Sequence, residues 1–162
     1  MEVRDLVAFF VVARGIESSD IIAERTRTDK IVCATRAMIV GLGLDIAEVD
    51  RIEEAIARHG AAFLERLFTS AEVEYCERFK NRYERYAARF ATKEAAMKAL
   101  GTGWSHGVRW RDIEVVREPG GKPTLRLSGE ARAIADRLGV KHISMTITHS
   151  GNVAMAQVIF EG

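Results

Sequence analysis

A carboxylate interrupts an otherwise apolar helical row in this sequence. At a spacing of three or four residues, the chain carries Tyr83, Ala87, Phe90, Glu94, Met97 and Gly101. This spacing places the six residues on one face of a helix. Because a lone ion is costly to remove from water, a Glu94 that faces the core needs a cation, a metal or a hydrogen-bond network as its partner.

The same predicted helix carries a row of basic residues beside Glu94. Positions 82, 85, 89 and 93 are Arg, Arg, Arg and Lys, and Lys98 follows Glu94 by one turn. A solvated charged face would explain the row, and a Glu94–Lys98 ion pair is an ordinary arrangement on a helix. Neither explains an acid in the apolar row. A magnesium ion would, because it is commonly held by one or two carboxylates and substrate phosphates.

A strand with one bare face is predicted at residues 39–46. Its apolar face carries Val40, Leu42, Leu44 and Ile46. The other face carries Gly41 and Gly43 and ends at Asp45. Glycines in a strand indicate the close approach of another backbone or a ligand, and tight packing against a helix is the alternative. Asp45 is then a natural second ligand for a metal at Glu94.

The remaining pattern predicts an α+β fold with the order βαααββαββ. Helices are expected at residues 49–59, 71–79, 82–100 and after the cap Ser128 as far as Leu138, and further strands at 112–116, 124–127, 142–148 and 153–160. Thr69 followed by Glu72 forms a capping box that opens the second helix. Gly60 is expected to end the first helix.

Length and composition suit one domain with an N-terminal extension. The 162 residues are 48% hydrophobic and 29% charged, which is ordinary for a globular protein. Residues 1–37 are mostly polar and weakly periodic, whereas the strand pattern begins at Met38. We expect residues 1–37 to be an appendage that is not native or not ordered, with an extra helix at 6–13 as the alternative. Residues 38–162 then form the functional domain.

Charge and cysteine content argue against several classes of protein. The 24 basic and 23 acidic residues give a net charge of +1, so no general nucleic-acid binder is expected. The longest N-terminal apolar run, residues 6–13, is too short to span a membrane, so no membrane partner is expected. Cys33 and Cys76 form no metal-spaced pair, and isolated thiols suit a reducing compartment. A cytoplasmic protein is expected.

Several motifs, in the same order, resemble the holo-[acyl-carrier-protein] synthase family of 4′-phosphopantetheinyl transferases. They are MIVGLGLDI at 38–46, Arg51-Ile52, RFATKEA at 89–95, KALGTG at 98–103, GKP at 121–123 and TITHS at 146–150. The resemblance runs from Met38 to the C-terminus. It implies a single domain of the phosphopantetheinyl-transferase type, with an antiparallel sheet packed against a long helix.

The resemblance also implies a reaction. Members of this family transfer the 4′-phosphopantetheine arm of coenzyme A to a serine of an apo acyl carrier protein and release adenosine 3′,5′-bisphosphate. They use Mg²⁺ and usually assemble as homotrimers with sites between subunits. The expected pathway is fatty-acid or polyketide biosynthesis, and thus lipid metabolism.

The two acids are expected to carry the chemistry. By resemblance, Asp45 and Glu94 bind magnesium together with the pyrophosphate of coenzyme A. The attacking serine must lose its proton, so a base is needed within hydrogen-bond reach or through one water. Glu94 is expected to act as that base, either directly or through a metal-ordered water.

Other matched residues are expected to bind coenzyme A or the carrier protein. The resemblance implies that Arg51 meets the acidic carrier. Contacts with the phosphates and the nucleotide are implied for Arg89, Lys98, Gly121, Lys122, Pro123 and His149. Lys93 is expected either to contact a phosphate or to be solvated.

Two other functions fit the same residues. A magnesium-dependent hydrolase of nucleotides or pyrophosphates would use the same acids and basic groups, and would release product without a carrier protein. A non-catalytic module would dock acidic proteins through Arg82, Arg85 and Arg89, and would tolerate the loss of Glu94.

Overall fold

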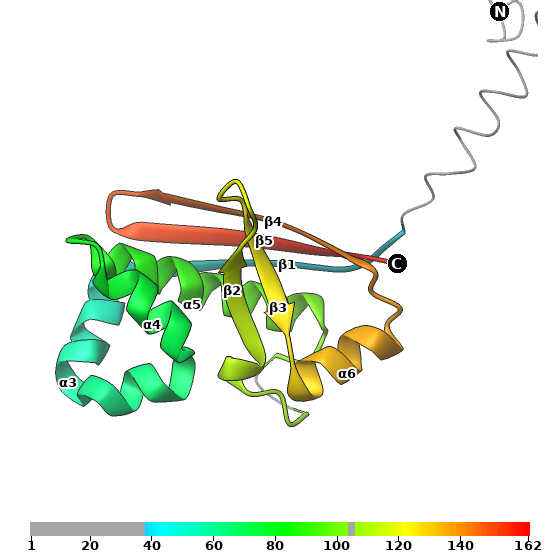
Figure 1. Cartoon of the computed structure of the whole chain (residues 1–162), viewed down its shortest axis with the longest axis horizontal. Coiled ribbons are helices and arrows are strands. Elements are labelled where there is room, and N and C mark those ends of the chain that lie inside the picture. The colour runs from blue at the N-terminus through cyan, green and yellow to red at the C-terminus, as the bar shows by residue number, and fades with distance from the viewer. Residues whose placement is uncertain (1–37, 104–105) are drawn as a thin grey trace, which may run out of the picture. The chain divides into compact units, whose positions relative to one another are not determined.

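The strands and helices follow the predicted order in the part of the chain that the structure, a computed structural model, describes: residues 38–103 and 106–162 (Figure 1). The strands are β1 (Ile39–Glu48), β2 (Ile113–Arg117), β3 (Pro123–Leu127), β4 (His142–Ser150) and β5 (Val153–Glu161). The helices are α3 (Val49–Leu67), α4 (Ser70–Glu77), α5 (Arg82–Ala99) and α6 (Gly129–Arg137), with a 3₁₀ turn η1 (Trp110–Asp112) before β2. The expectations for residues 1–37 lie outside the described residues. Within the described ranges, no helix is long and apolar enough to cross a membrane.

Three strands form the main sheet and two form a separate hairpin. The main sheet is antiparallel in the order β1-β5-β4, and β2 pairs with β3. In the register of the main sheet, Asp45 lies opposite Ala156, which lies opposite Ile147. Helix α5 packs on β1 and β5. The expected α+β fold, with an antiparallel sheet against a long helix, is confirmed.

The two glycines of β1 allow α5 to lie directly on the strand. A Cβ atom on Gly41 would come within 2.2 Å of the Ala99 carbonyl oxygen, and one on Gly43 within 1.8 Å of the Ala95 carbonyl oxygen. Ala95 and Ala99 are themselves small and buried, so helix and strand backbones meet without intervening side chains. The bare face of β1 therefore packs against a helix.

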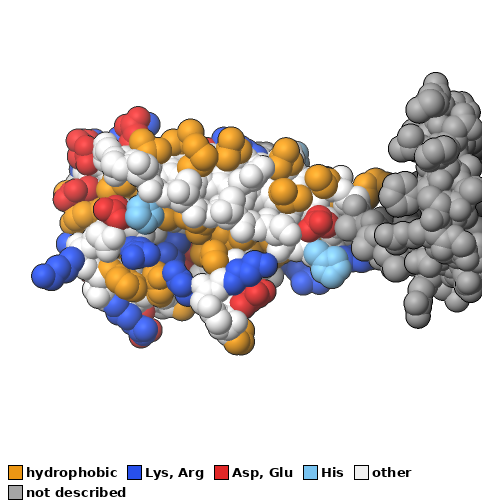
Figure 2. Space-filling model, turned by 90° about the horizontal axis from the view of Figure 1, so that it is seen from above, with side chains coloured by type: hydrophobic (Ala, Val, Ile, Leu, Met, Phe, Trp, Pro, Cys, Tyr) orange, Lys and Arg blue, Asp and Glu red, His pale blue; other side chains and the backbone are white. Residues whose placement is uncertain are grey.

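The opposite face of the main sheet is open and apolar. Leu42, Leu44 and Ile46 are 57%, 49% and 54% exposed. Their register partners on β5 are Ile159, Gln157 and Met155. In Figure 2, which looks onto the molecule from above, hydrophobic side chains form a row along one margin. The alternation predicted for β1 is confirmed, but its leucines face outward and its glycines face the core.

The first helix departs from its predicted course. Its regular part ends at Gly60, as expected, because Gly60 has non-helical φ and ψ angles of 56° and −135°. A second helical segment then continues to Leu67, which the prediction of a helix at 49–59 missed. That segment places Phe63, Leu64 and Leu67 against the core at helical spacing.

The other elements lie within two residues of their predicted bounds. The capping box of α4 is present, because Thr69 N donates to Glu72 Oε2 at 2.9 Å and Glu72 N donates to Thr69 Oγ1 at 3.3 Å. The cap expected at Ser128 is only partly right. Ser128 occupies the N-cap position of α6 but makes no side-chain cap bond, and its backbone N donates instead to Asp112 O at 2.8 Å.

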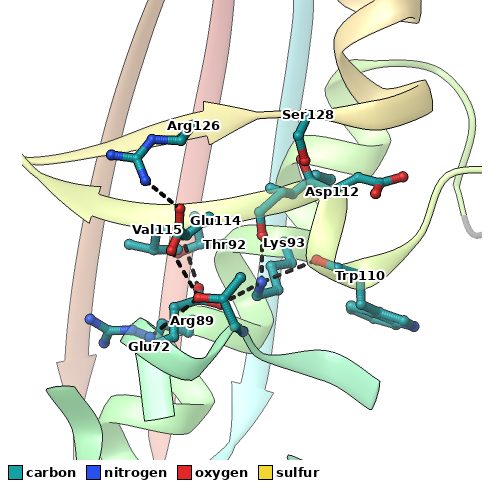
Figure 3. Close-up of polar contacts among 12 residues, drawn as sticks. Glu72, Arg89, Thr92, Lys93, Trp110, Asp112, Glu114, Val115, Arg126 and Ser128 are labelled. Carbon is teal, nitrogen blue, oxygen red and sulfur yellow. Dashed lines mark hydrogen bonds and ion pairs between the residues drawn. The ribbon is translucent and has the colours of Figure 1, made fainter. Parts of the chain in front are cut away.

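A buried ion pair joins α5 to α4, and the hydrogen bonds of its two residues reach η1 and β2 (Figure 3). Lys93 Nζ lies 2.8 Å from Glu72 Oε2, and the two side chains are 0% and 1% exposed. Lys93 also donates to the carbonyl oxygens of Trp110 and Ile113, and Glu72 accepts from Val115 N at 3.0 Å. Burial lowers the pKa of the Lys93 ammonium, and Glu72 opposes this effect. Both alternatives expected for Lys93, phosphate contact and solvation, are wrong, because Glu72 holds it inside the protein.

Breaking this pair should cost far more than removing an exposed lysine of the same helix. Lys93→Met leaves the Glu72 carboxylate buried without its cation, and we expect the free energy of unfolding to fall by about 3–5 kcal/mol. Urea unfolding followed by circular dichroism measures the change. Glu72→Gln added to Lys93→Met should recover part of the loss, because no unpaired charge then remains. Lys98→Met is the matched control, and equal stability of the two single variants would contradict the prediction.

Candidate functional site

The two predicted metal ligands lie on facing elements at the edge of the sheet formed by β1. Asp45 lies on the face of β1 toward α5, with its side chain 16% exposed, and Glu94 is partly buried on α5. Lys98, one turn further along α5, donates to Asp45 Oδ1 at 2.8 Å and to Leu44 O at 3.0 Å. The structure thus brings Asp45, Glu94 and Lys98 together, and we call them the acidic cluster.

The glycine contact explains why these residues meet. Gly43 lies under Ala95, and Asp45 is the next residue of β1 on the same face. The strand face that is bare at Gly43 therefore presents a carboxylate where α5 presents Glu94 and Lys98. A larger residue at position 43 would push the helix away from this contact.

Glu94 lies in an electrostatic environment that disfavours its charge. Burial raises the pKa of the Glu94 carboxyl, the Asp45 carboxylate raises it further, and Lys98 lowers it. The ordinary Glu94–Lys98 ion pair is not what forms, because the Lys98 ammonium bonds to Asp45 instead. Two neighbouring carboxylates with one ammonium leave negative charge to be neutralised.

This donor set fits magnesium in part. Among the described residues, no group of three or more His, Cys, Asp and Glu side chains could hold a metal ion by itself. Magnesium usually keeps several waters and is bound through one or two carboxylates plus substrate phosphates. Asp45 and Glu94 supply those carboxylates, so they suit a metal that arrives with a phosphorylated substrate.

A second group of residues lies on the α4 side of α5. The Arg89 guanidinium is buried and lies 4.2 Å from the centroid of the Tyr75 ring, and Arg117 lies 5.2 Å from the same centroid. Arg85 lies 4.5 Å from the centroid of Phe79. We call Arg85, Arg89 and Arg117 the arginine cluster. Within residues 38–103 and 106–162, none of the three pairs with a carboxylate, and the Nε atoms of Arg85 and Arg89 are buried without a hydrogen-bond partner.

An uncompensated group of guanidinium ions is suited to binding anions such as phosphate. The helical spacing of basic residues placed Arg85 and Arg89 in one row, but it did not identify the aromatic rings against which they pack. Arg117 and Tyr75 were missed, because they come from β2 and α4 and no spacing along the chain links them to α5. Stacking on the ring holds the Arg89 side chain in place.

The turn before β3 belongs to this second group. Arg117 Nη1 donates to Gly121 O at 2.8 Å, which ties the turn to the arginine cluster. Gly121 has a φ angle of 87°, a conformation that favours glycine. Lys122 is exposed, and Pro123 begins β3. Tyr75 and Arg117 thus connect Arg89 to this turn.

His149 and Arg51 lie away from the acidic cluster. His149 lies on β4, with its Nδ1 atom 4.0 Å from Glu84 Oε2. Strand β5 separates β4 from β1, so strand spacing puts the Cα atoms of His149 and Asp45 roughly 12 Å apart. Arg51 is exposed on α3, on the same helical face as the exposed Arg58.

The two clusters project from different sides of α5. Arg85 and Glu94 are nine positions apart, which is about two and a half turns at 3.6 residues per turn. They therefore point in opposite directions. One copy of the chain brings the predicted metal ligands together with Lys98, and separately places Arg89 near the turn at Gly121, but it does not join these two groups.

The one described cysteine, Cys76, does not supply a reactive thiol. Cys76 is fully buried, and burial raises the pKa of its thiol to about 12. It is therefore not a reactive thiolate at neutral pH. Cys33 lies outside the described residues.

The chain resembles one family along most of its length. Residues 41–158 match the model of the 4′-phosphopantetheinyl transferase superfamily. The holo-[acyl-carrier-protein] synthase of Solibacter usitatus is 57% identical over 124 residues, which cover 76% of this chain and 99% of that protein. The crystal structure of the synthase from Neisseria meningitidis has a TM-score of 0.71 at 30% identity, covering 77% of this chain and 100% of that one. The Helicobacter pylori synthase in complex with coenzyme A has a TM-score of 0.65 at 32% identity, covering 74% and 98%.

Removing the charge of Glu94 should not destabilise the metal-free protein at neutral pH. The pKa of Glu94 is raised in the folded state, so the ionised carboxylate costs stability above that pKa and the cost disappears as the pH falls through it. We expect Glu94→Gln to be as stable as the wild type near pH 4 and more stable at pH 8, by about 1 kcal/mol or less because the carboxyl is partly solvated. Urea unfolding at the two pH values, without divalent ions, measures this difference. A variant less stable than wild type at pH 8 would refute it.

Proposed function

Because the chain belongs to the 4′-phosphopantetheinyl transferase superfamily, and within it to the holo-[acyl-carrier-protein] synthase family, we propose that it transfers the 4′-phosphopantetheine group of coenzyme A to a serine of an apo acyl carrier protein and releases adenosine 3′,5′-bisphosphate. The observation that carries the proposal is the meeting of Asp45 with Glu94 and Lys98 inside the matched region. The comparisons do not favour the alternative of a nucleotide or pyrophosphate hydrolase.

The acidic cluster is the proposed metal site. Asp45 and Glu94 would hold Mg²⁺ through their carboxylates, with phosphate oxygens of coenzyme A as further ligands. Bound there, the ion would neutralise charge on the reacting phosphates. Lys98 would help to neutralise the charge on these phosphates, because its exposed ammonium lies beside both carboxylates.

Glu94 is the proposed base. The carrier serine forms a bond from its oxygen to the phosphorus attached to pantetheine, and the bond from that phosphorus to the departing phosphate oxygen breaks. The serine proton must leave as the oxygen attacks, and Glu94 takes it directly or through an ordered water.

The arginine cluster and the turn beside it form the proposed site for the nucleotide end of coenzyme A. Arg89 is held on the Tyr75 ring with an Nε atom that has no hydrogen-bond partner, and Arg117 adds a second guanidinium at the same ring. Gly121, Lys122 and Pro123 line the turn that Arg117 holds. His149 would add a further phosphate or adenosine contact.

We propose that the enzyme is a homotrimer with sites between subunits. A single copy keeps the acidic cluster on one side of α5 and the arginine cluster on the other. A neighbouring copy that presents its arginine cluster to the acidic cluster would complete the site. The open apolar face of the main sheet supports such an assembly, because Leu42, Leu44 and Ile46 would otherwise stay in water.

Arg51 is the proposed contact for the acidic carrier protein. Both Arg51 and Arg58 are exposed on one face of α3, which suits long-range attraction to an acidic partner. A hollow of about 270 Å³ lies at the second segment of α3 and is lined by Phe63, Arg66, Leu67, Phe90 and Trp110. Its aromatic lining would accept an apolar side chain of the carrier.

The transferase domain is proposed to be residues 38–162, with residues 1–37 as an appendage. Two matches support this division. The superfamily model matches residues 41–158, and the Solibacter usitatus synthase aligns with 124 residues of this chain over 99% of its own length. We further propose a cytoplasmic enzyme that serves fatty-acid or polyketide biosynthesis.

Mass spectrometry of an apo carrier protein incubated with coenzyme A and Mg²⁺ tests the reaction. We expect the carrier to gain one phosphopantetheine with the wild type, and the rate to fall at least about 100-fold with Asp45→Asn or Glu94→Gln, because each removes a charge that faces the reacting phosphates. Chelation of the metal should have the same effect. Release of adenosine 3′,5′-bisphosphate without any carrier would favour a hydrolase instead, and full activity of either variant would contradict the metal site.

Sedimentation of the full chain tests the assembly. Leu44→Asp places a charge on the open sheet face, and we expect it to convert a trimer into monomers with loss of transfer. Leu138→Asp is the matched control, since Leu138 is also exposed, at 39%, but does not lie on the sheet. A wild type that sediments as a monomer, or a Leu44→Asp protein that stays trimeric, would count against the proposed interface.

A further inference from the structure

Resting on the proposed function and going beyond it, we propose that Lys98 couples metal binding to the arrival of coenzyme A. In this view Lys98 serves as the cation for Asp45 until the diphosphate of the substrate arrives. The divalent ion and the diphosphate then bind together, while either binds poorly alone. Lys98 would thus couple the binding of the metal to that of the diphosphate, and would also contact a phosphate.

The first support is the geometry of the Lys98 ammonium. Its Nζ atom donates to Asp45 Oδ1 at 2.8 Å and to Leu44 O at 3.0 Å, so two acceptors of β1 hold it. The Asp45 side chain is 16% exposed and that of Lys98 is 49% exposed. The carboxylate is therefore the sheltered partner, and the ammonium beside it is the one that remains open to solvent.

The second support is the charge balance of the cluster. Two carboxylates and one ammonium leave a net charge of −1, from Asp45, Glu94 and Lys98. A divalent cation alone would turn this into +1 and would lie close to the ammonium. At a separation of a few ångströms in a water-like dielectric, this repulsion amounts to about a tenfold loss of metal affinity.

A diphosphate reverses the balance. Its oxygens supply negative charge for both the metal and the ammonium, so Lys98 no longer needs Asp45. The lysine side chain has a flexible four-carbon stem, and a charge that is half open to solvent can turn toward a phosphate without unfolding any element. Because binding free energies are linked, the diphosphate should tighten metal binding by the same factor by which the metal tightens diphosphate binding.

Mn²⁺ binding to the full chain, followed by electron paramagnetic resonance without carrier protein so that no turnover occurs, tests the coupling. Wild-type protein should bind Mn²⁺ weakly alone and more tightly with coenzyme A. Lys98→Met removes the charge but keeps a chain of similar length, and we expect it to bind Mn²⁺ alone about tenfold more tightly. The tightening produced by coenzyme A should shrink by the same factor.

Two control variants isolate the effect of the charge beside Asp45. Lys98→Arg keeps a cation there and should keep the wild-type pattern. Lys141→Met removes an exposed lysine before β4 and should leave Mn²⁺ affinity unchanged. Tighter binding in Lys141→Met would show that net charge alone is responsible, and would overturn the proposal.

The outcomes separate this coupling from the proposed reaction. If wild-type protein modifies the carrier and Lys98→Met binds Mn²⁺ no more tightly than wild type, including no binding by either, the coupling is wrong and the reaction stands. If wild-type protein does not modify the carrier in the mass-spectrometric assay, the proposed function is wrong, whatever the metal affinities.

Discussion

The close contact between α5 and β1 determines where the acidic residues of the site meet. At Gly41 and Gly43 the helix backbone occupies the space where a side chain would otherwise lie. The contact brings the face of β1 that continues to Asp45 against the helix that carries Glu94. Two carboxylates that repel each other are thus held together by packing, and the packing is tight because small residues form both surfaces.

The buried Lys93–Glu72 pair holds α5 from its other side. Lys93 reaches carbonyl oxygens at η1 and β2, and Glu72 joins the same network from the first turn of α4. Consecutive residues of α5 therefore have opposite tasks. Lys93 fixes the helix within the protein, and Glu94 meets Asp45 at the edge of the sheet. Since a buried charge is costly unless it is paired, the position of α5 is tied to that of α4.

Local sequence patterns predicted the helices and strands. Contacts between residues far apart in the sequence could not be predicted in the same way. The α4 capping box involves residues three positions apart, and the alternation of β1 involves neighbours, so both could be predicted from spacing. The partner of Lys93 could not, because Glu72 reaches it only through the packing of two helices. For the same reason Arg117 and Tyr75 were missed beside Arg89. The outward orientation of Leu42 and Leu44 depends on which face α5 covers, and the alternation of the strand does not specify that.

The burial of Lys93 also makes it a chemical reporter of folding. Acylating reagents modify free amines, and Lys98, Lys122 and Lys141 present theirs at the surface. The Lys93 amine is fully enclosed and paired, so a reagent can reach it only when α4 and β2 separate from α5. Protein that acquires a label at Lys93 has therefore opened its interior, whereas labels at exposed lysines such as Lys98, Lys122 and Lys141 report nothing but their exposure.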